Sequence, residues 1–69
     1  MPTFDIDALI SITIRPASRI GTNLFDAEAM IYSRTTNALL GNTSGTGETP
    51  LKAERAALTK AKDEARRLA

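Results

Sequence analysis

An alternating pattern over residues 4–14 constrains the fold of this chain more than any other feature. The apolar residues of the pattern occupy every second position: Phe4, Ile6, Ala8, Ile10, Ile12 and Ile14. Period-two alternation rich in β-branched residues is typical of a strand with one buried face. The sequence therefore predicts a strand over about residues 4–14, ended by Pro16, which lacks the backbone donor of other residues. An amphipathic helix from Asp5 is the alternative, but it would scatter these apolar residues around its circumference.

The rest of the chain predicts two helices. One is expected over about residues 22–40, with Thr22 or Asn23 as its cap and Gly41 at its end. Ser, Thr and Asn at 33–37 are weak helix formers and mark either a kink or a polar turn in it. The second helix is expected over about 50–68, with Thr49 as cap and Pro50 in the first turn. Glycine, serine and threonine dominate residues 41–49 and predict a flexible linker.

These elements predict an α+β fold that is mostly helical. The 69 residues form one small domain, in which residues 1–21 are an extended association arm and 22–69 a helical hairpin. A lone strand leaves its backbone donors and acceptors unpaired, so residues 4–14 are expected to complete their hydrogen bonding against a second copy or another protein.

The composition limits how such a small chain is stabilised. It contains neither cysteine nor histidine, which rules out a disulfide framework and a Cys/His zinc site. A core of this size supplies only about 3–5 kcal/mol, which leaves oligomerisation as the remaining source of stability. We expect no cofactor and no metal.

Charge and hydropathy give weak indications of partner and location. The net charge of +1 is too small to indicate a nucleic-acid partner by itself. No apolar run approaches the ~18 residues that cross a bilayer, and the N-terminus lacks the basic start of a secretory signal. We therefore expect a soluble protein made in the cytosol, with no membrane partner. Bases are concentrated in residues 50–69, so a head-to-tail contact between copies would join unlike charges.

An enzyme is the least supported class. General acid-base and nucleophilic catalysis usually draw on His or Cys, and neither residue occurs in the chain. Asp5 and Asp7 share one face of the predicted strand, where two acids would discourage unwanted strand pairing.

The predicted order of strand, helix and helix resembles the ribbon-helix-helix repressors. In those proteins two strands pair across a dimer axis and place their outward side chains in the major groove of DNA. The resemblance implies a DNA-binding dimer that reads bases with Ser11, Thr13 and Arg15. Asp5 and Asp7 would face the same phosphate-lined groove, which argues against it.

The function we favour from the sequence is a non-catalytic protein–protein association module. We expect a small structural subunit of a larger assembly, for example a minor virion capsid, connector or tail component. A small inhibitor that docks on an enzyme complex is an alternative. Strand addition and helix packing would place these residues against the partner: Phe4, Ile6, Ile10, Ile12, Ile14, Leu51, Leu58 and Leu68. Ile12→Asp is then expected to prevent assembly.

Overall fold

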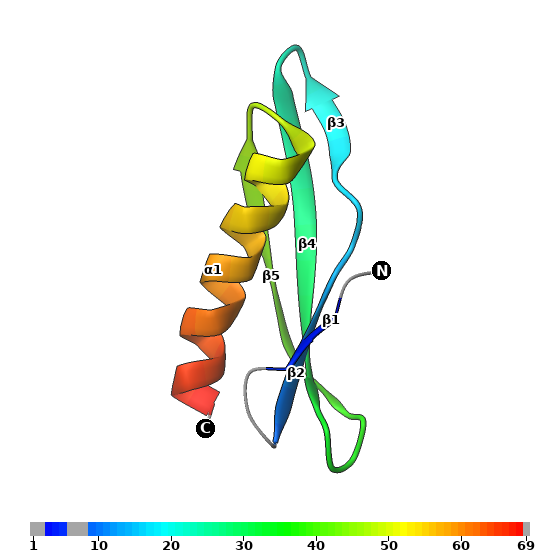
Figure 1. The fold of residues 1–69 in the computed structure, drawn as a ribbon, viewed down its shortest axis with the longest axis vertical. Helices are drawn as coiled ribbons and strands as arrows, with labels where there is room; N and C mark the ends of the chain where they lie inside the picture. Colours follow the sequence, from blue (N-terminus) through cyan, green and yellow to red (C-terminus); the bar gives the residue numbers. More distant parts are fainter. Residues whose placement is uncertain (1–2, 6–8, 69) are drawn as a thin grey trace.

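A computed structural model of the chain describes residues 3–5 and 9–68. These residues form five antiparallel strands and one helix: β1 (Thr3–Asp5), β2 (Ile10–Ile14), β3 (Ser18–Gly21), β4 (Leu24–Ser33), β5 (Leu39–Gly47) and α1 (Pro50–Leu68). Figure 1 shows α1 along one side of the sheet, with its N-terminal end beside the end of β5. The architecture is a sheet covered on one face by a helix, so the expected mostly helical fold is wrong.

The strand predicted over residues 4–14 is two strands, and its partners lie in the same chain. β2 pairs with β1 on one side and with β4 on the other, so that Ile12 lies between Phe4 and Ile31. Both edges of β2 are therefore occupied. The prediction that this segment needs a second copy or another protein is wrong, and the basis for a ribbon-helix-helix dimer is lost with it. Ile6 lies outside the described residues.

The helix predicted over residues 22–40 is instead the β3–β4 turn, β4 and the start of β5. Thr22 and Asn23 connect β3 to β4, and Asn23 adopts a φ of 56°, in the left-handed region that asparagine tolerates. Residues 34–38 form the β4–β5 turn, where the Ser33 amide donates to the Ala38 carbonyl oxygen at 2.9 Å. The polar segment that suggested a kink in a helix is thus a hairpin turn. The expected helical hairpin over 22–69 does not exist.

The linker predicted over residues 41–49 is mostly the strand β5. It pairs with β4 from Phe25 opposite Gly47 to Tyr32 opposite Leu39, with an irregularity beside Ile31. The side of β5 that faces α1 is built from small residues at every second position, Gly41, Thr43, Gly45 and Gly47. Because three of these residues are glycines, the helix backbone can lie directly on the strand.

The C-terminal helix spans the range that the sequence predicts. The Lys52 amide donates to Thr49 Oγ1 at 3.2 Å and the Ala53 amide to the Thr49 carbonyl at 3.1 Å, which confirms Thr49 as the cap. Four buried alanines at intervals of one turn face the sheet: Ala53, Ala57, Ala61 and Ala65. Against them pack the buried residues of β2 and β4, which are Ile10, Ile12, Ile14, Ala27, Ala29 and Ile31.

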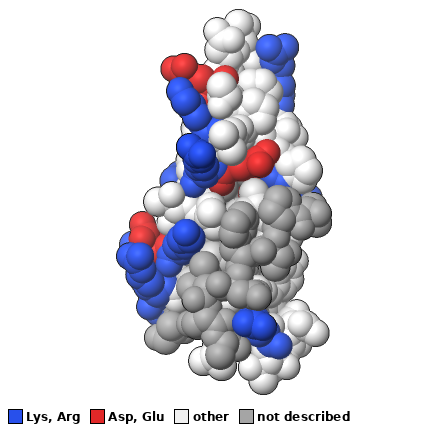
Figure 2. Space-filling model, viewed as in Figure 1, with Lys and Arg blue, Asp and Glu red and all other residues white. Residues whose placement is uncertain are grey.

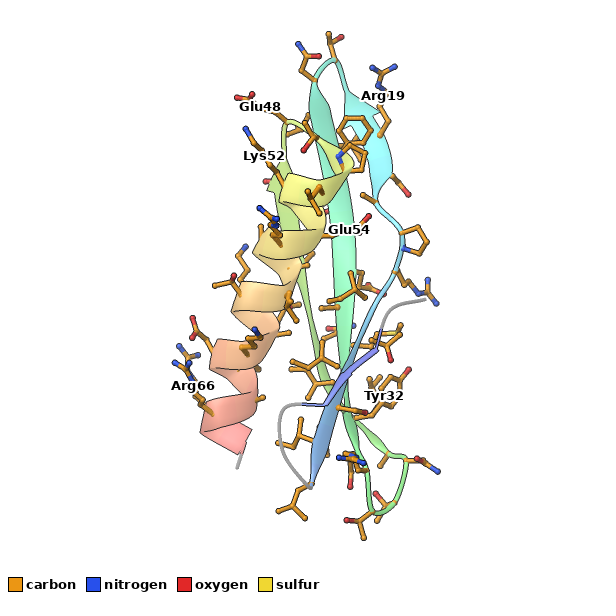
Figure 3. The ribbon with its side chains drawn as sticks, viewed as in Figure 1. Arg19, Tyr32, Glu48, Lys52, Glu54 and Arg66 are labelled. Carbon is orange, nitrogen blue, oxygen red and sulfur yellow. The ribbon has the colours of Figure 1, made fainter. Side chains whose placement is uncertain are left out.

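Glu54 links the helix to the break between β2 and β3. Its Oε2 accepts a hydrogen bond from the amide of Ala17 at 3.2 Å, just after Pro16 interrupts the strand (Figure 3). We expect Glu54→Ala to lower the free energy of unfolding by about 1 kcal/mol, because it leaves a half-buried amide without its acceptor. Glu64→Ala is the control: it removes the same charge from the same helix but only an exposed ion pair, at a cost of about 0.5 kcal/mol or less. Equal losses in urea denaturation would contradict the role given to Glu54.

Candidate functional site: the free edge of β5

Within residues 3–5 and 9–68, β5 pairs with β4 alone and leaves its other edge open. At 9 residues it is more than twice as long as either strand at the opposite edge, where β1 has 3 residues and β3 has 4. An open edge presents unpaired backbone donors and acceptors to any chain that approaches it.

The pairing register shows which residues of β5 direct their backbone groups to the open edge. The amide of Arg15 donates to the carbonyl of Glu28 at 2.9 Å, so the backbone groups of Glu28 point toward β2. Backbone groups alternate between the two edges along an antiparallel strand, so those of Ala27 and Ala29 point toward β5. Their partners Gly45 and Thr43 must point back toward β4. The alternate residues of β5 therefore direct their N–H and C=O groups outward. These are Asn42, Ser44 and Thr46, and all three are exposed.

A groove of about 260 Å³ adjoins this edge, between β5 and the C-terminal half of α1. It is lined by Thr43, Lys60, Asp63, Glu64 and Arg67, and by no residue of β2, β3 or β4. Thr43 Oγ1 donates to the carbonyl of Ala57 at 3.3 Å and thereby holds this part of the helix over the strand. The free edge and the groove share Thr43, and we call them together the β5 edge site: residues 42–46 with Lys60, Asp63, Glu64 and Arg67.

The charges of the groove are partly compensated within the helix. Arg67 lies 3.5 Å from Glu64, and Arg66, at the end of α1, lies 3.4 Å from Asp63. Lys60 forms no ion pair in the described part of the chain. Figure 2 shows blue side chains along the side of the molecule where α1 lies, with fewer red ones among them. The charges of the lining sum to zero, and Lys60 is the one charged lining residue outside these ion pairs.

The sheet face opposite α1 is a second, half-buried surface, and two pairs of its side chains contact one another. Glu28 lies 3.7 Å from Arg15, and the hydroxyl of Tyr32 donates to the sulfur of Met30 at 3.4 Å (Figure 3). This face presents complete strands, whereas the β5 edge presents unpaired backbone.

Most of the partner-binding residues predicted from the sequence lie elsewhere. Ile10, Ile12 and Ile14 are buried in the core beneath α1, and Leu58 packs partly against that core. Leu51 is exposed in the first turn of α1. Phe4 lies in β1 opposite Ile12, Leu68 ends α1, and Ile6 is not described. The groove is not lined by any of those whose side chains the structure describes, Ile10, Ile12, Ile14, Leu51 and Leu58. The residues of the β5 edge site were not predicted.

Other kinds of site find no support in the described residues. No three His, Cys, Asp or Glu side chains gather there as ligands for a metal. The helix of the described chain is too polar to cross a membrane.

The architecture, an antiparallel sheet with one helix on one face, defines a class of fold only. Comparisons with family models, curated proteins and solved structures find no match to this chain. Function must therefore be argued from the β5 edge site itself.

Proposed function

We propose that the chain is a non-catalytic protein–protein association module, in which β5 accepts an extended segment of a partner protein. The observation that carries this proposal is the open edge with the outward backbone groups of Asn42, Ser44 and Thr46. A partner segment gains main-chain hydrogen bonds from such an edge, and alternate side chains of the segment give specificity.

The composition of β5 supports acceptance of a strand. Proteins usually protect edge strands with charged residues such as lysine, with proline, or by keeping the strand short. Residues 39–47 contain no charged residue and no proline. The β5 edge thus lacks protection by charge, by proline and by short length against pairing with another chain.

Two exposed leucines at the start of β5 add apolar area to the site. Leu39 and Leu40 are 56% and 41% exposed, beside the irregularity in the β4–β5 pairing. A segment that continues along β5 would cover them together with the backbone edge. Burial of apolar surface contributes about 25 cal/mol per Å², so even partial cover of two leucines adds to the affinity.

A small structural subunit of a larger assembly is the role that suits such a module, and a minor virion component is one form of it. Its contribution would be to fix a neighbouring protein by strand addition. In this proposal the partner binds at β5, whereas the sequence places it at the strand predicted over residues 4–14.

Ser44→Pro tests the proposal. The amide of Ser44 points away from β4, so proline removes an outward donor without removing a hydrogen bond of the sheet. The probe is a synthetic nine-residue peptide of alternating threonine and valine with blocked ends and glutamate at its centre. We expect this peptide to shift the amide NMR signals of residues 42–46, and we expect Ser44→Pro to weaken binding about tenfold.

Two further variants at residue 44 show whether the loss of peptide binding in Ser44→Pro comes from the missing amide donor. Ser44→Ala retains the amide and is expected to bind as the unchanged chain does. Ser44→Lys places a charge on the exposed edge without altering the backbone, and it should also weaken binding. If the peptide shifts no β5 signal at millimolar concentration, the proposed function is wrong.

A further inference from the structure

The close approach of α1 to Gly45 and Gly47 disfavours the β5 of a second copy as the strand that binds this edge. Neighbouring strands lie about 4.8 Å apart, whereas packed helices need about 8–10 Å between their axes. The backbone of α1 lies directly on β5, since a Cβ added at Gly47 would come within 2.6 Å of Lys52 Cβ and 2.7 Å of the Ala53 amide nitrogen. Two copies paired beside Gly45 and Gly47 would therefore bring their helices closer together than packed helices lie. The site admits a segment that carries no helix on that face.

The register determines which side chain of an incoming segment enters the groove. Residues directly opposite each other on paired strands project to the same face. Thr43 projects toward α1 and lines the groove. The partner residue that lies opposite Thr43 therefore directs its side chain into the groove, toward the helical turn that carries Lys60.

The groove favours an acidic side chain at that position. Its two carboxylates, Asp63 and Glu64, already lie within 3.4 and 3.5 Å of Arg66 and Arg67. Lys60 is exposed and has no acidic partner within the part of the chain that the structure describes. A carboxylate entering the groove would gain an ion pair with Lys60, whereas an incoming lysine would meet it with like charge.

We propose that the partner of this chain is a protein whose extended segment presents an aspartate or glutamate opposite Thr43, where it pairs with Lys60. This inference rests on the proposed function, because it names the segment that the β5 edge accepts. An ion pair at a solvated rim contributes at most about 1 kcal/mol, so the preference for an acidic over a neutral residue is roughly fivefold or less.

A charge-swap experiment tests the inference. The glutamate-centred peptide is compared with a twin that carries lysine at its centre, and both are titrated into the isotope-labelled chain at low salt. We expect the glutamate peptide to bind more tightly, and we expect Lys60→Glu to reverse this order. The preference should shrink as salt is added, because the pair is exposed.

Lys62→Glu is the matched control, since it makes the same charge change on the same helix outside the groove lining. It is expected to preserve the preference for the glutamate peptide. Equal binding of both peptides, or the same reversal in Lys60→Glu and Lys62→Glu, overturns the acidic-segment inference while strand addition to β5 stands. Failure of both peptides to shift any β5 signal overturns the proposed function as well.

Discussion

Gly45→Ala is expected to lower the free energy of unfolding by about 3 kcal/mol. A Cβ at residue 45 would overlap the amide nitrogen of Ala57, and it would lie 2.6 Å from the carbonyl carbon and 2.7 Å from the Cβ of Ala56. These are mostly backbone atoms of a packed helix, so no single side chain can rotate away. Overpacking of a core costs about 1–3 kcal/mol, and a rigid neighbour places this substitution at the upper end. Urea denaturation followed by circular dichroism measures the loss.

Gly41→Ala on the same strand is the matched control. A Cβ at residue 41 would meet nothing within 4 Å, and the residue has no positive φ. Alanine restricts the unfolded chain more than glycine does, so this variant is expected to be unchanged or more stable by about 0.5 kcal/mol. If both variants lose the same stability, the close approach of α1 to β5 is not the cause.

Two elements of the fold could be predicted from sequence because their local signals agree with their tertiary environment. α1 has a capping threonine, proline in its first turn and a composition of strong helix formers. β2 shows alternation because isoleucine fills one face while Ser11 and Thr13 occupy the other. In both elements the buried face is more hydrophobic than the exposed face. The apolar residues therefore recur with the period of a helix or of a strand, and the element can be recognised from the sequence.

The sequence predicts a helix where β4 lies, because the residues on the buried face of β4 are small and its other face is partly apolar. Ala27 and Ala29 are buried beneath α1, yet alanine favours helices in isolation. Met30 and Tyr32 on the opposite face obscure the alternation that Asp26 and Glu28 begin. With β4 assigned to a helix, β2 had no visible neighbour, and the inference of an outside partner for it followed from that error.

The β5 edge site was missed for a related reason. Glycine and threonine suggest a flexible linker when only hydrophobicity is considered. The spacing of the glycines does carry a signal. Gly41, Gly45 and Gly47 are separated by even numbers of residues, as are residues on one face of a strand. Four alanines one turn apart in the following helix supply the matching small surface. Only the packing of one small surface on the other distinguishes this strand from a linker.

The second large effect is expected from Ile12→Ala, which should cost about 3 kcal/mol. Ile12 is 0% exposed and lies opposite Ile31, which is also fully buried. Truncation of a buried isoleucine to alanine costs about 2–5 kcal/mol, because it removes apolar contacts and leaves a cavity. A domain of this size has about that much stability in total, so a large unfolded fraction is expected at room temperature. Ile20→Ala is the control, since Ile20 is 55% exposed, and its loss should stay within about 0.5 kcal/mol.

Variants at Ile12 and at Ser44 distinguish a loss of folding from a loss of association. The sequence suggested that Ile12→Asp blocks assembly because Ile12 contacts a partner. The buried position of Ile12 instead predicts that this variant unfolds, so any loss of assembly would be indirect. Ser44→Pro should remain folded by circular dichroism and yet fail to bind the peptide. A folded Ile12→Asp chain that has lost peptide binding would reverse this assignment, because it would return the contact surface to β2.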